Sequence, residues 1–219
     1  MLKEKCLLVY SGGLDSTVLL YHLLNNGYNV STITFDYGQK HKKELNSALY
    51  FTKLMSVPNQ IVDMSFYSKL LLNNVITSKN DVPDGHYADE IMKKTVVPNR
   101  NLLFLTVAVG LAIDSKIDLV AIACHSGDHT IYPDCRPEFI DSANSTMSLG
   151  NWGGAKIISP FVNFTKTDIV RLGADLNVPM EKTWSCYKGW DLHCGTCGTC
   201  YERKESFELA NVKDSTGYV

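Results

Sequence analysis

The segment Ser11-Gly12-Gly13-Leu14-Asp15-Ser16 contains the residue types that hold a phosphate group. It follows an unbroken apolar run, residues 6–10, and leads into residues 17–24, whose apolar side chains recur at helical spacing. Two glycines leave backbone N–H groups unshielded, and the start of a helix adds free N–H groups and the positive end of its dipole. The hydroxyl groups of Ser11, Ser16 and Thr17 add further donors. The segment therefore predicts an anion site; the plainer interpretation is a glycine turn in which Ser and Asp cap a helix.

Asp15 is unexpected inside an anion site, because a carboxylate repels phosphate. A bound Mg²⁺ ion removes the conflict, since Mg²⁺ binds a carboxylate and phosphate oxygens together. The segment lacks the G-x-x-x-x-G-K-[ST] pattern of Walker A and the G-x-G-x-x-G pattern of dinucleotide-binding folds. We therefore expect a Mg²⁺-dependent polyphosphate site of another kind, with Asp15 as the metal contact.

A second chemical feature is a run of four cysteines with the spacing C-x7-C-x2-C-x2-C. Zinc takes four soft ligands in a tetrahedron, and Gly195 and Gly198 permit the tight loop that wraps around it. Four thiolates close the coordination sphere, so the predicted zinc, one per chain, is structural. An iron–sulfur cluster is the alternative, because C-x2-C-x2-C also occurs in ferredoxins, and His193 is an alternative ligand. The predicted ligands are Cys186, Cys194, Cys197 and Cys200.

The composition limits the class of protein. The chain has 219 residues, 45% hydrophobic and 20% charged, as in an ordinary globular domain. Its formal net charge is -2, so it lacks the basic excess typical of binding to nucleic-acid phosphates. The longest apolar run, residues 102–113, is shorter than the about 20 residues of a membrane span. The charged start and short apolar stretch do not form a signal peptide, and we expect a cytoplasmic protein without nucleic-acid or membrane partners.

The pattern along the chain predicts an α/β domain with a doubly wound, mostly parallel sheet. Strands are expected at residues 6–10, 29–35, 60–63, 118–123 and 157–161. Helices are expected at residues 17–24, 42–55, 98–115, 137–147 and 165–177, and in a charged tail up to residue 211. The helix at 165 begins with Thr165-Lys166-Thr167-Asp168, a capping-box pattern. Residues 73–95 lack periodicity and predict a long loop.

The S-G-G-x-D-S segment, placed between a buried strand and a helix, resembles the pyrophosphate-binding loop (PP-loop) of the ATP pyrophosphatases. Further motifs extend the resemblance to the 7-cyano-7-deazaguanine synthase family, which makes a queuosine precursor. These motifs are Phe35–His41, Val97–Asn101, Tyr132–Arg136 and the segment from Ser185 through Cys200. Together they cover residues 6–205, nearly the whole chain, in the order typical of that family.

The resemblance implies an ATP-dependent C–N ligase that converts 7-carboxy-7-deazaguanine and ammonia to 7-cyano-7-deazaguanine. The carboxylate would be adenylated and amidated, and the amide would then be activated and dehydrated to the nitrile. Ser11, Asp15 and Lys166 would act in catalysis, with ATP, Mg²⁺ and Zn²⁺ as cofactors. An ATP-binding domain, residues 1–180, would precede a small zinc-binding lobe, residues 181–219, and the chain would form a homodimer. The residues implied in ATP binding are Tyr10, Ser11, Gly12, Gly13, Leu14, Asp15, Ser16, Thr17, Val18, Leu19, Leu20 and Arg100.

Six residues near the carboxyl ends of predicted strands are candidates for contacts with the deazaguanine substrate. They are Asp36, Tyr37, Gln39, His41, Asp134 and Arg136. An aromatic ring with amide and carboxylate groups can read a base, and Arg136 can bind the substrate carboxylate. The plainer interpretation is a strand-to-helix loop with an Asp cap, and an ion pair between Asp134 and Arg136.

Two cations at predicted helix starts are also ambiguous. Arg100 begins a helix, where a cation is unfavourable for the helix dipole unless an anion docks beside it. Lys166 resembles a lysine that many PP-loop enzymes keep near the phosphates; the alternative is a solvated lysine in a capping turn.

Two other functions fit parts of the sequence. A tRNA-modifying sulfurtransferase or a lysidine-type ligase also uses a PP-loop, but normally carries a basic tRNA-binding module, which a net charge of -2 does not indicate. A zinc-ribbon binding module with a regulatory nucleotide site would explain only the short cysteine cluster. Consumption of ATP with the free base and ammonium, with and without tRNA, distinguishes these functions.

Overall fold

The computed structural model describes residues 3–39, 42–71, 75–76, 84–85, 90–188 and 191–219. Within them five parallel strands form one sheet in the order β3-β2-β1-β4-β5. The doubly wound parallel sheet predicted from the sequence is confirmed. The strands are β1 (Lys5–Val9), β2 (Asn29–Asp36), β3 (Asn59–Asp63), β4 (Leu119–Ala121) and β5 (Lys156–Ile158).

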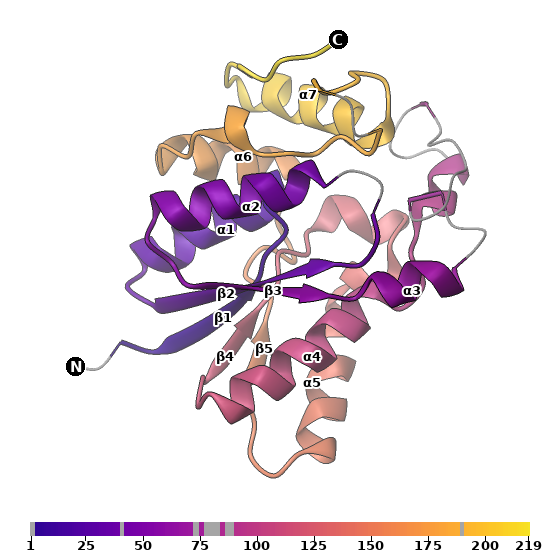
Figure 1. The fold of residues 1–219 in the computed structure, drawn as a ribbon. Helices are drawn as coiled ribbons and strands as arrows, with labels where there is room; N and C mark the ends of the chain where they lie inside the picture. The colour runs from indigo at the N-terminus through magenta and orange to yellow at the C-terminus, as the bar shows by residue number, and fades with distance from the viewer. Residues whose placement is uncertain (1–2, 40–41, 72–74, 77–83, 86–89, 189–190) are drawn as a thin grey trace.

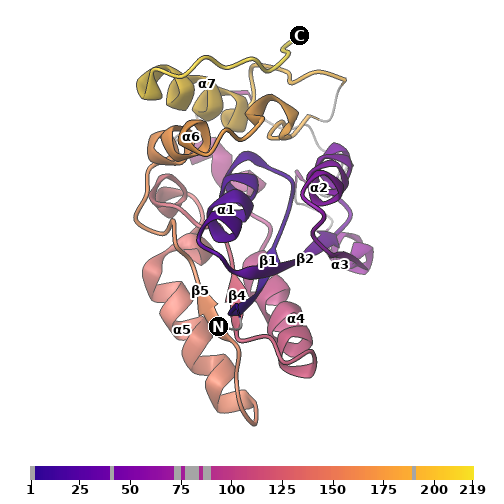
Figure 2. The ribbon, with the colours of Figure 1, turned by 90° about the vertical axis from the view of Figure 1, so that its left-hand side faces the viewer.

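Helices cover both faces of the sheet (Figure 1, Figure 2). Helices α1 and α2 lie on one face, and α4 and α5 lie on the other. On the first side α6 packs against α1, and α7 packs against α6 as an outer layer. The helices are α1 (Leu14–Asn25), α2 (Lys43–Leu54), α3 (Ser65–Leu70), α4 (Arg100–Asp114), α5 (Pro137–Gly150), α6 (Lys166–Asp175) and α7 (Gly198–Ala210).

The central strand β1 divides the hydrophobic core into two parts. Successive strand residues point to opposite faces of a sheet. Cys6 and Leu8 are buried in the part that contains α1, and Leu7 is buried in the part that contains α4. Because β1 is covered on both faces, its sequence is an unbroken apolar run and not an alternating one.

Helix α4 is the long apolar segment of the sequence. Together with the short 3₁₀ segment before it, it forms a stretch, Lys93–Asp114, whose length and mean hydropathy of 1.6 would suffice to cross a membrane. In the structure the face of α4 that carries Phe104, Leu105 and Ala108 is buried against β1 and β4. One face packed on a sheet is the arrangement of a core helix in a globular domain.

The element boundaries differ from the prediction at a few places. The strand expected at residues 157–161 ends at Ile158, because Pro160 cannot donate a hydrogen bond to the ladder. Helix α3 follows β3 and was not expected, since six residues are too few for a periodic pattern. Much of the loop expected at residues 73–95 lies outside the described residues, and its end forms the 3₁₀ segment Glu90–Thr95.

The capping box predicted at the start of α6 is confirmed. Asp168 N donates to Thr165 Oγ1 over 3.1 Å, and Thr165 N donates to Asp168 Oδ2 over 2.9 Å. These two bonds satisfy backbone N–H groups that a helix start leaves free. They fix the first turn of α6, which carries Lys166.

The carboxyl-terminal segment packs firmly against the preceding residues. Phe207 of α7 is buried among the same side chains as Val170 of α6. The fully buried guanidinium of Arg203 donates to Thr183 Oγ1 over 2.9 Å and to Met180 O over 2.8 Å, and lies 3.4 Å from a carboxylate oxygen of Asp214. The segment therefore shares a packed core with α6, and the division at residue 180 stays a prediction.

Candidate active site

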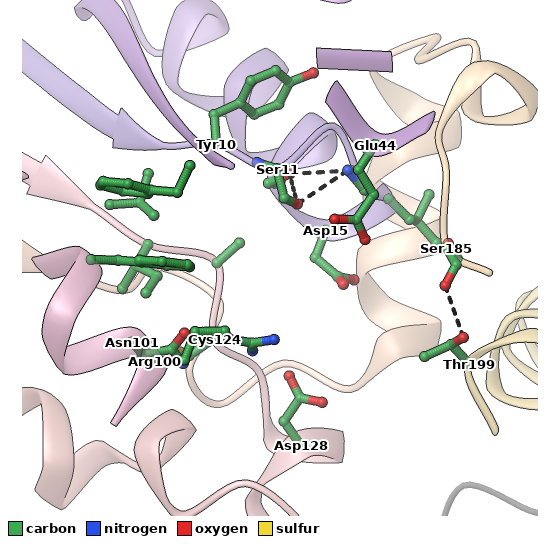
Figure 3. Close-up of a pocket in the computed structure, with 18 of the residues that line it drawn as sticks. Tyr10, Ser11, Asp15, Glu44, Arg100, Asn101, Cys124, Asp128, Ser185 and Thr199 are labelled. Carbon is green, nitrogen blue, oxygen red and sulfur yellow. Dashed lines mark hydrogen bonds between the residues drawn. The ribbon is translucent and has the colours of Figure 1, made fainter. Parts of the chain in front are cut away.

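An open pocket lies at the carboxyl ends of β1, β2 and β4 (Figure 3). The chain places β2 on one side of β1 and β4 on the other, so the strand order reverses here. Ligands bind at such points in open α/β sheets, because the loops that leave neighbouring strands run in opposite directions. The walls come from the loop after β1, the starts of α4 and α6, and the segment after β4. The carboxyl-terminal part of the chain adds Trp184, Ser185, Tyr187, Thr199 and Glu202.

The loop between β1 and α1 is fixed from its outer side. Gly12 has a φ of +80°, and a Cβ atom at this position would lie 2.5 Å from Glu44 O, so only glycine fits. The carbonyl oxygen of Gly12 accepts from Ser47 Oγ over 2.7 Å and from Trp184 N over 3.2 Å. Helix α2 and the segment before the cysteines therefore both hold the loop in place.

The inner side of this loop offers donors to the pocket. The first residue before α1 is Gly13, which has no side chain to occupy the free N–H groups of the first turn. Ser11 Oγ lies 3.1 Å from Ser16 Oγ and accepts from Gly13 N over 3.2 Å. Both hydroxyl groups line the pocket, whereas the Thr17 hydroxyl is buried against the hydroxyl of Tyr10. The arrangement suits an anion at the start of α1.

An ion pair connects this anion site to α6. Lys166 Nζ lies 2.7 Å from Asp15 Oδ2 and 3.5 Å from Glu202 Oε2, which belongs to α7. Burial alone would raise the pKa of Asp15, but Lys166 and then His125 hold it below its ordinary value. Burial alone would lower the pKa of Lys166, but Asp15 and Glu202 raise it. Lysine and aspartate are therefore both charged at neutral pH.

A histidine and two carboxylates extend the charged cluster. The buried His125 Nε2 lies 3.3 Å from Asp128 Oδ2 and 3.9 Å from Asp15 Oδ2. Ligand atoms of His125, Asp128 and Glu202 all lie within 4.8 Å of one another. Burial raises the pKa of Glu202, although Lys166 acts in the opposite direction.

The charges that line the pocket do not balance. Among the residues that the structure describes, two cations and four carboxylates line the pocket, which leaves an excess of two negative charges when all are ionised. Such a pocket repels a polyphosphate unless a cation accompanies it. The cations are Arg100 and Lys166, and the carboxylates are Asp15, Glu44, Asp128 and Glu202.

The opposite wall of the pocket is aromatic and carries Arg100. Figure 3 places Arg100 and Asn101 across the pocket from Ser11 and Asp15. The rings of Phe35 and Phe104 stack with centroids 4.3 Å apart and an interplanar angle of 6°. This wall suits a flat ring that carries a negative group. The residues that complete it are Tyr37, Tyr132 and Tyr187.

The four cysteines of the carboxyl-terminal run come together beside the pocket. Their sulfur atoms all lie within 4.8 Å of one another, and the sulfurs of Cys197 and Cys200 are 3.5 Å apart. A tetrahedron with Zn–S distances of about 2.3 Å has sulfur–sulfur edges of about 3.8 Å. The site therefore fits a single metal ion. His193 does not join it, because its Nε2 accepts from Ser185 N over 3.1 Å. The thiols are those of Cys186, Cys194, Cys197 and Cys200.

The cysteine site and the pocket share a loop. Thr199 Oγ1 donates to Ser185 O over 2.8 Å, and both residues line the pocket together with Tyr187. Cys186 lies between Ser185 and Tyr187 in the sequence. A metal held by the thiols would therefore fix one wall of the pocket.

Comparison with known proteins identifies the family. A family model described as "Queuosine biosynthesis protein QueC" matches residues 5–211. The chain belongs to this family. It is 49% identical over 216 residues to the 7-cyano-7-deazaguanine synthases of Brucella ovis and Brucella melitensis biotype 2, which covers 98% of this chain and 93% of each relative. The resemblance that the motifs predicted is therefore confirmed.

A solved structure shares the fold. The NMN synthetase of Francisella tularensis superposes with a TM-score of 0.54 over 97% of this chain and 79% of that chain. At 13% sequence identity this likeness concerns the fold alone.

The structure brings most of the predicted nucleotide contacts to the pocket, but not all. Gly12 turns its carbonyl outward, and the side chains of the second turn of α1 are buried in the core. Those core residues are Thr17, Val18, Leu19 and Leu20. The predicted residues that line the pocket are Tyr10, Ser11, Gly13, Leu14, Asp15, Ser16, Arg100 and Lys166.

Of the residues predicted to contact the substrate, some line the pocket and others do not. Tyr37 and Gln39 line the pocket. Asp36 lies outside it and pairs with Lys42 at 2.9 Å. Asp134 Oδ2 accepts from Asn101 N over 3.2 Å, and Arg136 Nε donates to His129 O over 2.8 Å, so neither lines the pocket. His41 lies outside the described residues.

Several pocket residues were not predicted. Asp128 follows β4 at the same edge of the sheet as the phosphate loop, so its position in the sequence carried a usable signal. Glu202 carried none, because only the packing of α7 on α6 brings it to Lys166. Tyr187 lies in the motif that runs from Ser185 through Cys200, but its position in the pocket depends on how the cysteine loop folds.

Proposed function

We propose that the protein makes 7-cyano-7-deazaguanine from 7-carboxy-7-deazaguanine, ammonia and ATP. The observation that carries the proposal is one pocket with two unlike sides. The anion site at the start of α1 suits the phosphates of ATP, and the aromatic wall with Arg100 suits a flat, acidic base. The family of the chain and the names of its relatives support the same reaction.

The chemistry requires the substrate carbon to be activated twice. A carboxylate resists ammonia because its leaving group would be oxide. The carboxylate oxygen therefore attacks the α-phosphorus of ATP, the bond to the β-phosphate oxygen breaks, and pyrophosphate leaves. Ammonia displaces AMP from the acyl-adenylate and loses a proton, which gives the amide. The amide oxygen then attacks the α-phosphorus of a second ATP, and pyrophosphate leaves again. Loss of AMP and of both N–H protons then leaves the nitrile.

The protein's task in both activations is positioning and charge neutralisation. Ser11, Ser16 and the free N–H groups of α1 receive the departing pyrophosphate. Lys166 lies beside them and neutralises the charge that develops there. The leaving group departs from the same place each time, so one anion site serves both steps.

We propose Mg²⁺ as the cation that accompanies ATP. In the described part of the chain, the buried Asp15 Oδ1 has no hydrogen-bond partner, and the lining of the pocket carries two more carboxylates than cations. Asp15 would hold the ion. Asp128, which lies on the other side of His125 from Asp15, could supply a second oxygen. Bound there, Mg²⁺ would offset the negative charge of the phosphates.

We propose that the four-cysteine site holds one structural zinc ion per chain. The short sulfur–sulfur separations favour a single ion over an iron–sulfur cluster, in which the four cysteine sulfurs are spread over two or more irons. Backbone N–H groups also point at the sulfurs; Cys194 N, for example, donates to Cys186 Sγ over 3.4 Å. Such bonds stabilise thiolates as metal ligands.

The remaining parts of the proposal concern partners. The substrates are free small molecules in the cytoplasm, and neither nucleic acid nor a membrane takes part. Two copies form a homodimer, and each divides into the ATP-binding part, residues 1–180, and the zinc-binding lobe, residues 181–219.

An assay for ATP turnover tests the function. With 7-carboxy-7-deazaguanine, ammonium and ATP, the protein should release pyrophosphate and form the nitrile at a rate that added tRNA does not change. Activity that requires tRNA and falls steeply with salt would favour the tRNA-modifying alternative. Nucleotide binding without turnover would favour a binding module.

A further inference from the structure

Arg100 is the one pocket cation, among the described residues, that has no carboxylate within ion-pair distance. The other, Lys166, is paired with Asp15 and Glu202. The carboxylate of Asp134 acts on Arg100 from a distance greater than 4.0 Å. The guanidinium is half-buried and stays charged at any ordinary pH, so an anionic ligand in direct contact would stabilise it.

Three phenols and one carboxylate, that of Asp134, act on Arg100. Burial raises the pKa of Tyr37 to about 12, and it also raises the pKa values of Tyr132 and Tyr187. The three phenols are therefore protonated at neutral pH, so they do not neutralise the guanidinium. Their hydroxyl groups can instead act as additional donors to an anion bound there.

The start of α4 does not itself receive the anion. Asp134 Oδ2 already accepts from Asn101 N over 3.2 Å, and the Asn101 side chain donates to Asp134 O over 3.1 Å. The helix N-terminus is thus occupied by a protein carboxylate. An anion at this wall must be bound by the forked guanidinium of Arg100, whose geometry matches a carboxylate.

The position of Arg100 separates it from the phosphate site. Ser11 and Asp15 lie at the start of α1, and Arg100 starts α4, which covers the other face of the sheet. Figure 3 places them on opposite sides of the pocket. Beside Arg100 lie the stacked rings of Phe35 and Phe104. A single acidic group on a flat ring fits these neighbours, whereas a polyphosphate requires several donors and a metal.

We propose that Arg100 binds the carboxylate of the deazaguanine substrate and makes the enzyme select the acid over neutral analogues. This inference rests on the proposed function and assigns the role to Arg100 in place of Arg136, which lies outside the pocket. The Arg100 guanidinium holds the substrate carboxylate, and one oxygen of that carboxylate faces the anion site at the start of α1. The amide has no charge, so the affinity for the amide depends less on Arg100.

The test compares acid and amide substrates in Arg100→Gln and Arg100→Lys. For Arg100→Gln, KM for the acid should rise about 30-fold or more, the loss expected for a buried charge contact. KM for 7-amido-7-deazaguanine and KM for ATP should stay within about threefold of the parent values. Arg100→Lys should recover part of the loss. Arg171→Gln, an exposed arginine on α6, is the matched control and should leave all three constants unchanged.

Two results overturn the inference. An equal rise in KM for acid and amide would mean that Arg100 contacts the ring of the substrate or supports the pocket wall. A rise confined to KM for ATP would mean that Arg100 binds the nucleotide. If the parent protein turns over neither base, the proposed function fails on its own. Calorimetric binding of the acid with a non-hydrolysable ATP analogue then decides the role of Arg100: weakening by about 30-fold in Arg100→Gln supports it, and unchanged binding contradicts it.

Discussion

Lys166 Nζ lies 2.7 Å from Asp15 Oδ2, which joins the first turns of two helices that are 151 positions apart in the sequence. The ion pair holds the Lys166 ammonium group and the Asp15 carboxylate side by side at the anion site. On the proposed function, ATP exchanges these partners: Lys166 turns to the phosphates and Asp15 to the accompanying cation. Both residues are therefore required in their charged forms.

Asp15→Asn should abolish most turnover without loss of the fold. The amide keeps the shape of the carboxylate but not its charge, so the cation that accompanies ATP loses a ligand. We expect kcat to fall about 100-fold or more, as when other preorganised charge contacts are removed. Pyrophosphate release measured over a Mg²⁺ titration checks this. Asp175→Asn, at the exposed end of α6, is the control; a near-normal rate in Asp15→Asn at ordinary Mg²⁺ would refute the role.

Glu202→Gln tests whether α7 positions Lys166. Glu202 Oε2 lies 3.5 Å from Lys166 Nζ, and without its charge the lysine is held by Asp15 alone. We expect KM for ATP to rise and kcat to fall, together about tenfold in kcat/KM, which corresponds to about 1.4 kcal/mol. Glu208→Gln, exposed on the same helix, should change neither constant. Parent-like kinetics in Glu202→Gln would show that the charge of Glu202 does not position Lys166.

The succession of strands and helices along the chain and the phosphate loop were predictable because they depend on local pattern. The apolar run of β1, the glycines after it and the capping box at Thr165 each have one dominant structural interpretation. Only part of the charge cluster around Lys166 was predictable. Asp15 and Asp128 follow strands at the same edge of the sheet. Glu202 reaches Lys166 only because α7 packs against α6.

The predicted site residues that do not line the pocket have a common physical origin. A motif lists neighbouring residues, but a helix sends successive side chains in different directions. Asp15 and Ser16 therefore reach the pocket, while Val18 and Leu19 enter the core. Arg136 likewise follows a loop turn that directs its guanidinium to the backbone of His129.

The cap of α6 gives a pH-dependent prediction. Hydrogen bonds from the Thr165 hydroxyl and backbone N–H lower the pKa of Asp168 below its ordinary value. A carboxyl group with a lowered pKa stabilises the fold above the pKa of the unfolded chain, and the contribution disappears as pH falls through the folded value. Asp168→Asn should therefore lower the free energy of unfolding by about 1 kcal/mol at pH 7 and by less in acid.

Urea unfolding of the parent and Asp168→Asn at neutral and acidic pH measures this difference. Asp175→Asn on the same helix should show no such pH-dependent gap. A gap that stays constant, or that widens in acid, would contradict the assignment of the cap as the cause.

Removal of the metal should loosen the pocket wall as well as the cysteine loop. Cys197→Ser or treatment with a chelator should lower the melting temperature, because a structural zinc contributes directly to folding. Thr199 and Ser185 link this loop to the pocket, so KM for the base should rise before the protein unfolds. Elemental analysis should find one zinc per chain. Iron with visible charge-transfer absorption would contradict the zinc assignment, and a metal-free protein with parent stability would contradict the structural role.

Pyrophosphate counted per nitrile tests most directly whether one pocket activates the same carbon twice. Double activation predicts two pyrophosphates per nitrile from the acid with ammonia. Starting from 7-amido-7-deazaguanine without ammonia, it predicts one. Ser11→Ala should slow both reactions together, since Ser11 lies in the shared anion site. An amide that stays inert while the acid is converted, or a Ser11→Ala variant that is impaired in only one reaction, would contradict the account.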